Sequence, residues 1–306
     1  MIGTIYKKNS KFEAKKLGAA LVSKNISNHL KENIRGKNRD WLPLIYCWRG
    51  GQRSYAFATI LDQIGWNVGV VDGGYKSFRK HVSEFLNKNI ENYFLILLTG
   101  NTGTAKTKML NLIEERNGQT IDLENLANHK GSVFGSQGQK QPSQKLFETL
   151  IYDKVKNLKT GEPIFVEAES NKIGNLHIPK EFWKLMKNSP QIELSATVER
   201  RAQFLVEEYS EITTDLDLLE KQMKSLSTIA GPKVVESWLR MAKNKEFFEL
   251  AKQLIEKHYD PRYKRGLLRK KKEVFATLKI DDISPKGLSL MVDRILQTAN
   301  NRMKPL

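Results

Sequence analysis

The stretch YFLILLTGNTGTAKT, residues 93–107, decides the fold of most of this chain. Its apolar first half predicts a buried strand, and the residues KMLNLIEER that follow predict a helix. The glycine-rich connection fits the pattern G-x-x-x-x-G-K-T of a phosphate-binding loop (P-loop), although Ala105 stands where glycine is usual before the lysine. The alternative is an ordinary strand-to-helix turn with an incidental lysine. The predicted strand, the loop, the lysine and the predicted helix follow one another in the order and spacing of a P-loop, which favours that interpretation.

Each part of this loop has an expected role. Backbone N–H groups cradle phosphate oxygens, Lys106 supplies positive charge, and the hydroxyl of Thr107 can bind a magnesium ion. The Cβ of Ala105 is expected to crowd the phosphate or to strain the loop. The candidate phosphate-binding residues of the P-loop are Gly100, Asn101, Thr102, Gly103, Lys106 and Thr107.

Strands and helices alternate on both sides of this stretch. The order predicts an α/β protein whose mainly parallel sheet is covered on both faces, with a mostly helical part after residue 199. The polar segment NKNIEN, residues 87–92, predicts a linker, so we expect domains at 1–89 and 90–306. The expected strands are 42–47, 67–71, 93–99, 119–123, 163–168, 191–197 and 273–280; helices are expected at 54–64, 75–86 and near 287–299.

The only cysteine, Cys47, ends the apolar run LPLIYC and is followed at once by WRGGQRS. Gly50 and Gly51 allow successive backbone N–H groups to turn inward as an anion-binding nest, and Arg49 and Arg53 add positive charge. A helix is predicted just beyond, and helix N-termini and cations both favour a thiolate. The alternative is a buried cysteine that acts as a small apolar residue. The arginine and glycine context favours a reactive thiol.

Three carboxylates follow predicted strands. Glu167 and Glu169 end the run PIFVEAES, and Asp122 ends QTIDL. At the ends of strands these groups are candidate partners for a metal ion bound at the P-loop. For each of them the alternative is a cap at a helix N-terminus. No His and Glu spacing suggests a zinc site, and no Ser-His-Asp arrangement stands out.

The net charge of +17, from 51 Lys and Arg against 34 Asp and Glu, fits a polyanionic partner such as a nucleic acid. The alternative is compositional, because Lys, Asn and Ile are all abundant, as AT-rich coding produces. The segment DPRYKRGLLRKKKE, residues 260–273, favours the nucleic acid, since its basic residues are dense and include a nearby tyrosine. The candidate nucleic-acid-binding residues are Arg262, Lys264, Arg265, Arg269, Lys270, Lys271 and Lys272.

Composition also excludes several classes of protein. With 306 residues and 40% hydrophobic content the chain can build one large or two smaller cores. The longest apolar run, at 93–98, is too short to span a membrane, and the start MIGTIYKKNS lacks the apolar core of a signal peptide. A single cysteine excludes an intrachain disulfide framework. We expect a cytoplasmic protein with no membrane partner, no required protein partner and no tightly bound cofactor.

Several segments of the chain carry a family resemblance. YCWRGGQRS (46–54) is similar to the active-site loop of rhodanese domains, whose cysteine carries a transferable sulfur, and VVDGGYKSF (70–78) is similar to the strand and turn that follow there. Together with the segments below, these resemble, in order, the bacterial tRNA 2-selenouridine synthase family. The further segments are LTGNTGTAKT (98–107), IDLENLANHKGSVFG (121–135), QPSQKLFE (141–148), FVEAES (165–170) and HYDPRY (258–263).

The resemblance implies a rhodanese-like domain followed by a P-loop NTPase-like domain, and two reactions on the wobble 2-thiouridine of tRNA. Geranyl diphosphate first alkylates the 2-sulfur, and selenium from selenophosphate then replaces the geranylated sulfur to give 2-selenouridine. Cys47 matches the family's rhodanese cysteine, which implies that it carries selenium, while Arg49 and Arg53 hold the selenophosphate anion. Mg²⁺ at the P-loop is an optional ion. The resemblance therefore implies a transferase, a selenotransferase acting on tRNA.

The chain departs from the family pattern at named places. Ala105 replaces the usual glycine, and Ala168 stands where the family more often has an acidic residue, which leaves Glu167 and Glu169 to serve a metal ion. The start MIGTIYKK looks like a point inside the family's rhodanese domain. We therefore expect domain 1–89 to be N-terminally incomplete.

Two other functions stay open at the level of sequence. One is a P-loop kinase or NTPase with a sulfurtransferase appendage, which ATP hydrolysis abolished by Lys106→Ala, without a tRNA product, would indicate. The other is an inactive, truncated copy that only binds tRNA, with strong salt dependence and no effect of Cys47→Ser.

Overall fold

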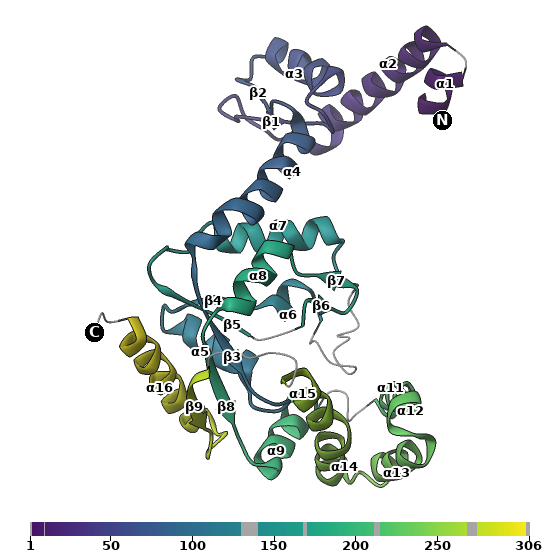
Figure 1. Ribbon diagram of the computed structural model, residues 1–306. Coiled ribbons are helices and arrows are strands. Elements are labelled where there is room, and N and C mark those ends of the chain that lie inside the picture. The colour runs from purple at the N-terminus through teal and green to yellow at the C-terminus, as the bar shows by residue number, and fades with distance from the viewer. Residues whose placement is uncertain are drawn as a thin grey trace. The chain divides into compact units, whose positions relative to one another are not determined.

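The computed structural model describes residues 2–8, 10–129, 140–167, 170–210, 215–267 and 274–303. The chain divides into two compact units, Met1–Ser83 and Glu84–Leu306, which are described separately (Figure 1). The boundary predicted after residue 89 lies just inside the second unit.

Unit 1 contains a small parallel sheet with helices. Strands β1 and β2 pair in parallel through Leu44 with Gly69 and Ile45 with Val70. Two helices before residue 29 were not predicted, because the apolar residues of the longer one do not gather on a single face. The elements are α1 Ile2–Lys8, α2 Lys11–Asn28, a π-helical turn His29–Asn33, β1 Leu44–Ile45, α3 Gln52–Ile64, β2 Gly69–Val70 and α4 Gly74–Glu84.

Unit 2 is built on a five-stranded sheet in the order β4-β5-β3-β8-β9, and every neighbouring pair is parallel. The predicted parallel sheet is therefore confirmed, and the strand that leads into the P-loop lies at its centre. The strands are β3 Phe94–Thr99, β4 Gln119–Ile121, β5 Pro163–Glu167, β8 Gln191–Ser195 and β9 Val274–Lys279. A separate antiparallel pair joins β6 Lys172–Ile173 to β7 Leu176–His177.

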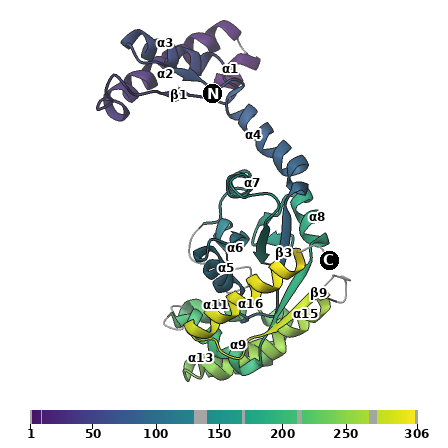
Figure 2. The same ribbon diagram turned by 90° about the vertical axis from the view of Figure 1, so that its left-hand side faces the viewer.

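Buried residues are continuous along β3, although successive side chains of a strand point to opposite faces of the sheet. Ile96 and Leu98 belong to a core that includes residues of α5 and α16, which lie together in Figure 2. Leu95 and Leu97 are equally buried, so both faces of the central strand are covered. The helices around the sheet are α5 Lys106–Glu115, α6 Leu123–Leu126, α7 Gln144–Val155, α8 Lys180–Asn188, α9 Val198–Glu208 and α16 Pro285–Met303.

The predicted helical part follows α9 and has a core of its own around the fully buried Trp238. Its elements are α11 Leu216–Lys224, α12 Ser227–Ala230, α13 Pro232–Lys243, α14 Phe247–Leu254, a π-helical turn Ile255–Tyr259 and α15 Asp260–Leu267. None of the helices in the described ranges is long and apolar enough to cross a membrane.

The segment predicted as a linker is helical instead. A π-helical turn covers Phe85–Asn89 and a 3-10 turn covers Ile90–Asn92. Leu86 and Ile90 are buried within these turns, and two buried anchors four residues apart stabilise helical structure. The polar residues between them gave the segment its linker-like composition.

Candidate functional site

The thiol loop of unit 1 joins β1 to α3, and two glycines make its path feasible. Gly50 has φ +60°, and a Cβ there would lie 2.7 Å from both Gly74 N and Val71 O. Gly74 has φ +58°, and a Cβ there would collide with the carbonyl oxygen of Cys47. The loop and the start of α4 therefore approach so closely that side chains at these positions are excluded.

The sulfur of Cys47 accepts hydrogen bonds at the N-terminus of α3. Gly51 N donates to Sγ at 3.3 Å, and Ser54 Oγ lies 3.2 Å from it. Partial burial raises the pKa of the thiol, but hydrogen bonds from Ser54 and from backbone groups of Arg49, Gly51 and Ser54 outweigh burial, and the pKa falls from 9.0 to about 6. At pH 7 the thiolate therefore outnumbers the thiol by about ten to one.

Arg49 and Arg53, predicted to hold an anion at this loop, are both exposed. The contacts that lower the pKa of the thiol come from hydrogen bonds rather than from either guanidinium. The anion-holding role of the two arginines stays a prediction, whereas the N–H of Gly51 does point at the sulfur as the nest requires.

The P-loop of unit 2 connects β3 to α5, as the sequence predicts. Lys106 Nζ donates to the carbonyl oxygen of Gly100 at 2.9 Å, so the lysine folds over the loop. Ala105 adopts φ 55° and ψ 28°, a left-handed conformation that strains any residue with a Cβ. Its side chain is buried in the sheet's hydrophobic core. Of the two effects expected of this alanine, strain is the one that the backbone displays.

Thr107 and Glu167 lie together beside the loop. Thr107 Oγ1 donates to Glu167 Oε2 at 3.1 Å, and Glu124 N donates to Glu167 Oε1 at 3.4 Å. Glu167, at the end of β5, is 1% exposed. A hydroxyl and a carboxylate at this position suit Mg²⁺, which takes few protein ligands and keeps several waters. No cluster of three or more His, Cys, Asp or Glu side chains able to hold a metal ion occurs in the described ranges.

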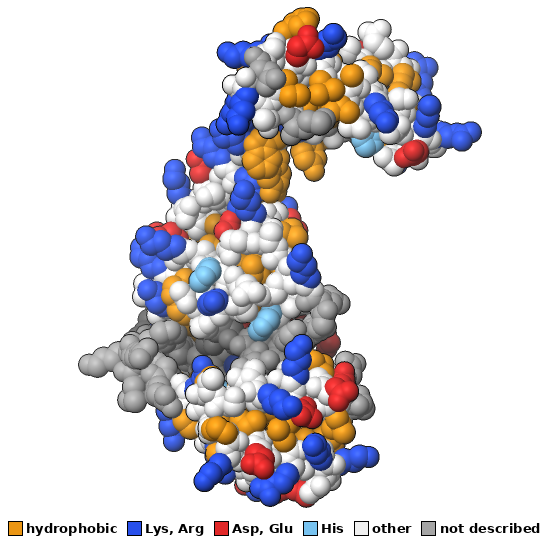
Figure 3. Space-filling model, turned by 90° about the vertical axis from the view of Figure 1, so that its right-hand side faces the viewer, with side chains coloured by type: hydrophobic (Ala, Val, Ile, Leu, Met, Phe, Trp, Pro, Cys, Tyr) orange, Lys and Arg blue, Asp and Glu red, His pale blue; other side chains and the backbone are white. Residues whose placement is uncertain are grey.

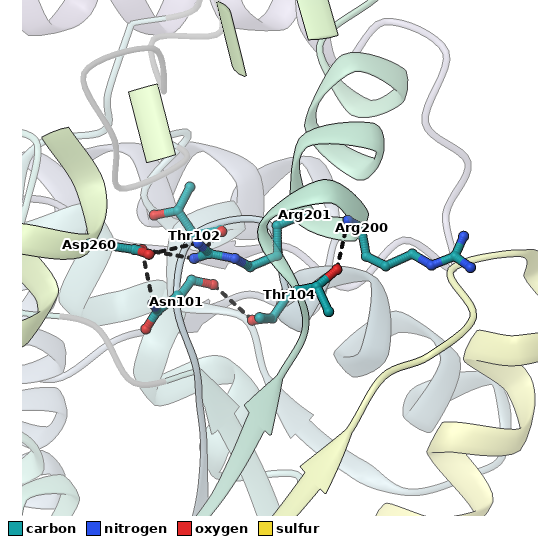
Figure 4. Close-up of polar contacts among 7 residues, drawn as sticks. Asn101, Thr102, Thr104, Arg200, Arg201 and Asp260 are labelled. Carbon is teal, nitrogen blue, oxygen red and sulfur yellow. Dashed lines mark hydrogen bonds and ion pairs between the residues drawn. The ribbon is translucent and has the colours of Figure 1, made fainter. Parts of the chain in front are cut away.

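A buried ion pair, absent from the sequence prediction, holds the P-loop against α15. Arg201 NH1 and NH2 donate to Asp260 Oδ1 and Oδ2, both at 2.8 Å (Figure 4). Asn101 Nδ2 also donates to Asp260 Oδ1 at 2.9 Å, and Arg201 NH1 reaches the carbonyl oxygen of Thr102 at 3.4 Å. Figure 4 shows that the neighbouring Arg200 points away from this cluster. Burial lowers the pKa of Arg201, and the charge of Asp260 opposes that effect.

A cavity of about 620 Å³ opens at the P-loop. Its lining includes Lys106, Thr107 and Glu167 from the sheet side and His258, Arg262 and Tyr263 from the C-terminal helices. The hydroxyl of Tyr263 accepts a hydrogen bond from Gly100 N at 3.0 Å. The basic segment that begins at Asp260 therefore reaches the mouth of the phosphate cavity.

A second, apolar groove, with a volume of about 70 Å³, adjoins this cavity. The two share Thr102, Leu205, Tyr209 and Tyr259 among their lining residues. The six remaining groove residues are all aliphatic or aromatic and come from α9, α11 and α14: Val206, Leu219, Phe247, Leu250, Ala251 and Leu254. A cavity lined by charged and polar side chains and an apolar groove thus meet at one side of the P-loop.

The other predicted site residues fall into three groups. Asp122 caps α6 by accepting from Asn125 N at 2.8 Å, so it has the capping role that was the alternative to metal binding. Arg262 and Lys264 are exposed on α15. Glu169, Arg269, Lys270, Lys271 and Lys272 lie outside the described residues, as does the side chain of Arg265.

The family profile and the sequence relatives described next are all tRNA 2-selenouridine synthases. A profile of the tRNA 2-selenouridine synthase AAA domain matches residues 93–229. A tRNA 2-selenouridine synthase of Psychromonas ingrahamii is 33% identical over 215 residues, 70% of this chain and 58% of that protein. Those of Nitrosomonas europaea and Shewanella denitrificans are 29% and 28% identical, over 84% and 89% of this chain and 66% and 81% of their own lengths.

Solved structures match at much lower similarity. A tRNA delta(2)-isopentenylpyrophosphate transferase from Staphylococcus epidermidis is 13% identical, covers 69% of this chain and 100% of that chain, and has a TM-score of 0.33, too low to support an argument. The sequence matches are the informative ones, although the chain spans only 58% and 66% of the first two relatives. The chain is therefore similar to tRNA 2-selenouridine synthases over most of its length, and residues 93–229 match the AAA domain of that family.

Proposed function

We propose that this chain is a transferase that converts 2-thiouridine in tRNA to 2-selenouridine, by geranylation of the 2-sulfur followed by replacement with selenium. The observation that carries the proposal is the apolar groove that adjoins the phosphate cavity. A prenyl diphosphate has the same two halves, an anionic head and a hydrocarbon tail.

The character of the groove favours this substrate over a nucleoside triphosphate. Next to its phosphates a nucleotide carries a ribose and a base, which need hydrogen-bonding partners when buried. The groove instead offers aliphatic and aromatic side chains such as Leu205, Val206 and Leu254. Each buried methylene of a prenyl tail contributes about 0.8 kcal/mol there.

In the first step the 2-sulfur of the nucleobase attacks C1 of geranyl diphosphate. The new C–S bond forms as the C–O bond breaks, and diphosphate leaves with the electron pair. Lys106 and the backbone N–H groups of the loop would stabilise the negative charge that develops on the leaving group. When Mg²⁺ is bound by Thr107 and Glu167, it would add positive charge at the same place.

In the second step the Cys47 thiolate, which a pKa of about 6 keeps ionised at neutral pH, adds to C2 of the geranylated base, and the geranylated sulfur leaves as a thiolate. The selenium of selenophosphate then adds to C2 and displaces the Cys47 thiolate. Water cleaves the P–Se bond, phosphate leaves, and 2-selenouridine remains. Arg49 and Arg53 are the proposed partners of the selenophosphate anion.

The proposal is tested by incubating the purified full chain with tRNA that contains 2-thiouridine, together with geranyl diphosphate, and then with selenophosphate. Mass spectrometry of the digested nucleosides is expected to show the geranylated base and then 2-selenouridine. Lys106→Ala should suppress the first product, and Cys47→Ser only the second. Unchanged 2-thiouridine with the unaltered chain contradicts the proposal, and ATP hydrolysis without a tRNA product would indicate the kinase alternative.

The groove is tested with Val206→Lys, which places a charged chain among its apolar residues. We expect the KM for geranyl diphosphate to rise at least tenfold, the cost of excluding about two methylenes, while inhibition by inorganic diphosphate stays unchanged. Gln203→Lys is the matched control, because Gln203 is an exposed residue of the same helix outside the groove. Equal KM values for the two variants contradict this assignment.

A further inference from the structure

Three aromatic side chains of unit 1 form a row next to the thiol loop. The Trp48 and Tyr75 rings have centroids 5.4 Å apart at an interplanar angle of 36°, and those of Tyr75 and Phe78 are 6.4 Å apart at 43°. Trp48 is 49% exposed and Phe78 is 38% exposed. This row, Trp48–Tyr75–Phe78, is called the aromatic row below.

Backbone hydrogen bonds tie the aromatic row to the cysteine. Tyr75 N donates to the carbonyl oxygen of Cys47 at 2.9 Å, and Lys76 N donates to that of Trp48 at 3.0 Å. Tyr75 and Phe78 are three residues apart on α4, a spacing that puts both side chains on one face of the helix. The start of α4 therefore holds the row at a set position relative to the reactive sulfur.

Around the row the exposed basic side chains outnumber the exposed carboxylate of Asp72. Arg49, Arg53, Lys76 and Lys80 are exposed in the same two segments that carry the three rings. Figure 3 shows hydrophobic and basic side chains intermixed over the surface of unit 1. Exposed rings interleaved with cations are the combination that single-stranded nucleic acids need, because bases stack on the rings while cations bind the phosphates. A protein partner would not require the cations, and a phosphate anion alone would not require the rings.

We propose that the aromatic row is the platform on which the target nucleobase of the RNA stacks when it is presented to Cys47. This inference rests on the proposed function, which requires a nucleobase to reach the sulfur. Trp48, Tyr75 and Phe78 are positioning residues here, since they hold the base by its face and leave its reacting edge to the thiol. A base must leave the helical stack before an enzyme can act on its ring atoms, and an aromatic surface replaces the stacking that is lost.

The test compares two oligoribonucleotides that differ at one position, one with 2-thiouridine in a single-stranded loop and one with an abasic residue there. Binding of each to the full chain is measured by fluorescence anisotropy. Trp48→Ala is expected to raise the Kd of the 2-thiouridine RNA by about 5- to 150-fold, since stacking on an aromatic residue contributes about 1–3 kcal/mol per base. The Kd of the abasic RNA should not change.

Two further variants guard against a loss of folding. Trp48→Phe keeps an aromatic face for stacking and is expected to retain most of the affinity for the 2-thiouridine RNA. Phe78→Ala should raise the Kd of the 2-thiouridine RNA and leave that of the abasic RNA unchanged. Phe12→Ala is the control, because Phe12 is 72% exposed in α2 of the same unit and is not part of the row. Equal Kd changes for the two RNAs, or none for either, overturn the inference. These readouts need no catalysis, so they separate its failure from that of the proposed function.

Discussion

Replacing Asp260 by alanine tests the ion pair that holds the P-loop against α15. Asp260 receives two hydrogen bonds from Arg201 at 2.8 Å and one from Asn101 at 2.9 Å, and the side chain of Arg201 is only 2% exposed. Removing one partner of a buried pair leaves the other charge without compensation, which costs about 3–5 kcal/mol. Because the side chain of Asp260 is 20% exposed and water can enter, we expect the lower end, about 3 kcal/mol.

The measurement is the free energy of unfolding of the full chain by denaturant, followed with a probe in unit 2 and extrapolated linearly. Asp293→Ala is the matched control, because Asp293 pairs with Arg116 at 3.1 Å but has a side chain that is 60% exposed, and such pairs contribute about 0–1 kcal/mol. The double variant Arg201→Met with Asp260→Leu should recover most of the loss, since no charge is left buried. Phosphate-loop function should stay impaired there, because Asn101 loses its partner.

A loss below about 1 kcal/mol for Asp260→Ala, equal to that of the surface control, would refute this reasoning. It would mean that Arg201 finds another anion or water as readily as it finds Asp260. If the free energy of unfolding of the double variant is as low as that of Asp260→Ala, the pair stabilises the fold through the packing of its side chains rather than through its charges.

Other changes have equally definite outcomes. Ala105→Gly should stabilise the chain by about 0.5–1 kcal/mol in denaturant unfolding, because relief of a left-handed alanine exceeds the entropy that glycine adds to the unfolded chain; a destabilised variant contradicts this. Alkylation of Cys47 by iodoacetamide should rise through a midpoint near pH 6 as the thiolate forms, and Ser54→Ala should move that midpoint upward; a midpoint that stays in place excludes the role of the serine hydroxyl. Arg262→Ala and Lys264→Ala should each weaken tRNA binding and reduce its salt slope by about 1 if they contact phosphate; an unchanged slope would remove them from the interface.

The sequence predicted those parts of the molecule in which the deciding residues are neighbours in the chain. The consecutive pattern of an apolar strand, a glycine-rich loop and a helix predicted the P-loop. In the structure β3, the loop and α5 follow one another at these residues. The same holds for the thiol loop, where Gly51 N reaches the sulfur four residues earlier. Local patterns succeed at such places because the hydrogen bonds and dihedral angles involved are themselves local.

The misses have a common physical origin as well. The segment 87–92 has the composition of a linker, yet two buried residues, Leu86 and Ile90, hold the stretch in helical turns. For Asp122 the sequence left metal binding and helix capping open, and in the structure its Oδ1 caps the helix that begins directly after it. In both cases the local sequence is compatible with two structures, linker or helical turn for residues 87–92 and metal ligand or helix cap for Asp122. The tertiary structure selects one of the two.

By itself the sequence determined the α/β class, the order of the strands along the chain, and the positions of the cysteine loop and of the glycine-rich loop between β3 and α5. Only the tertiary structure decided the contact of Arg201 with Asp260, 59 residues apart, the pairing of Thr107 with Glu167, and the apolar groove beside the P-loop. Such features depend on which strands become neighbours and which side chains lose their water, and burial of distant segments sets both. Residue spacing along the chain carries no direct record of that burial.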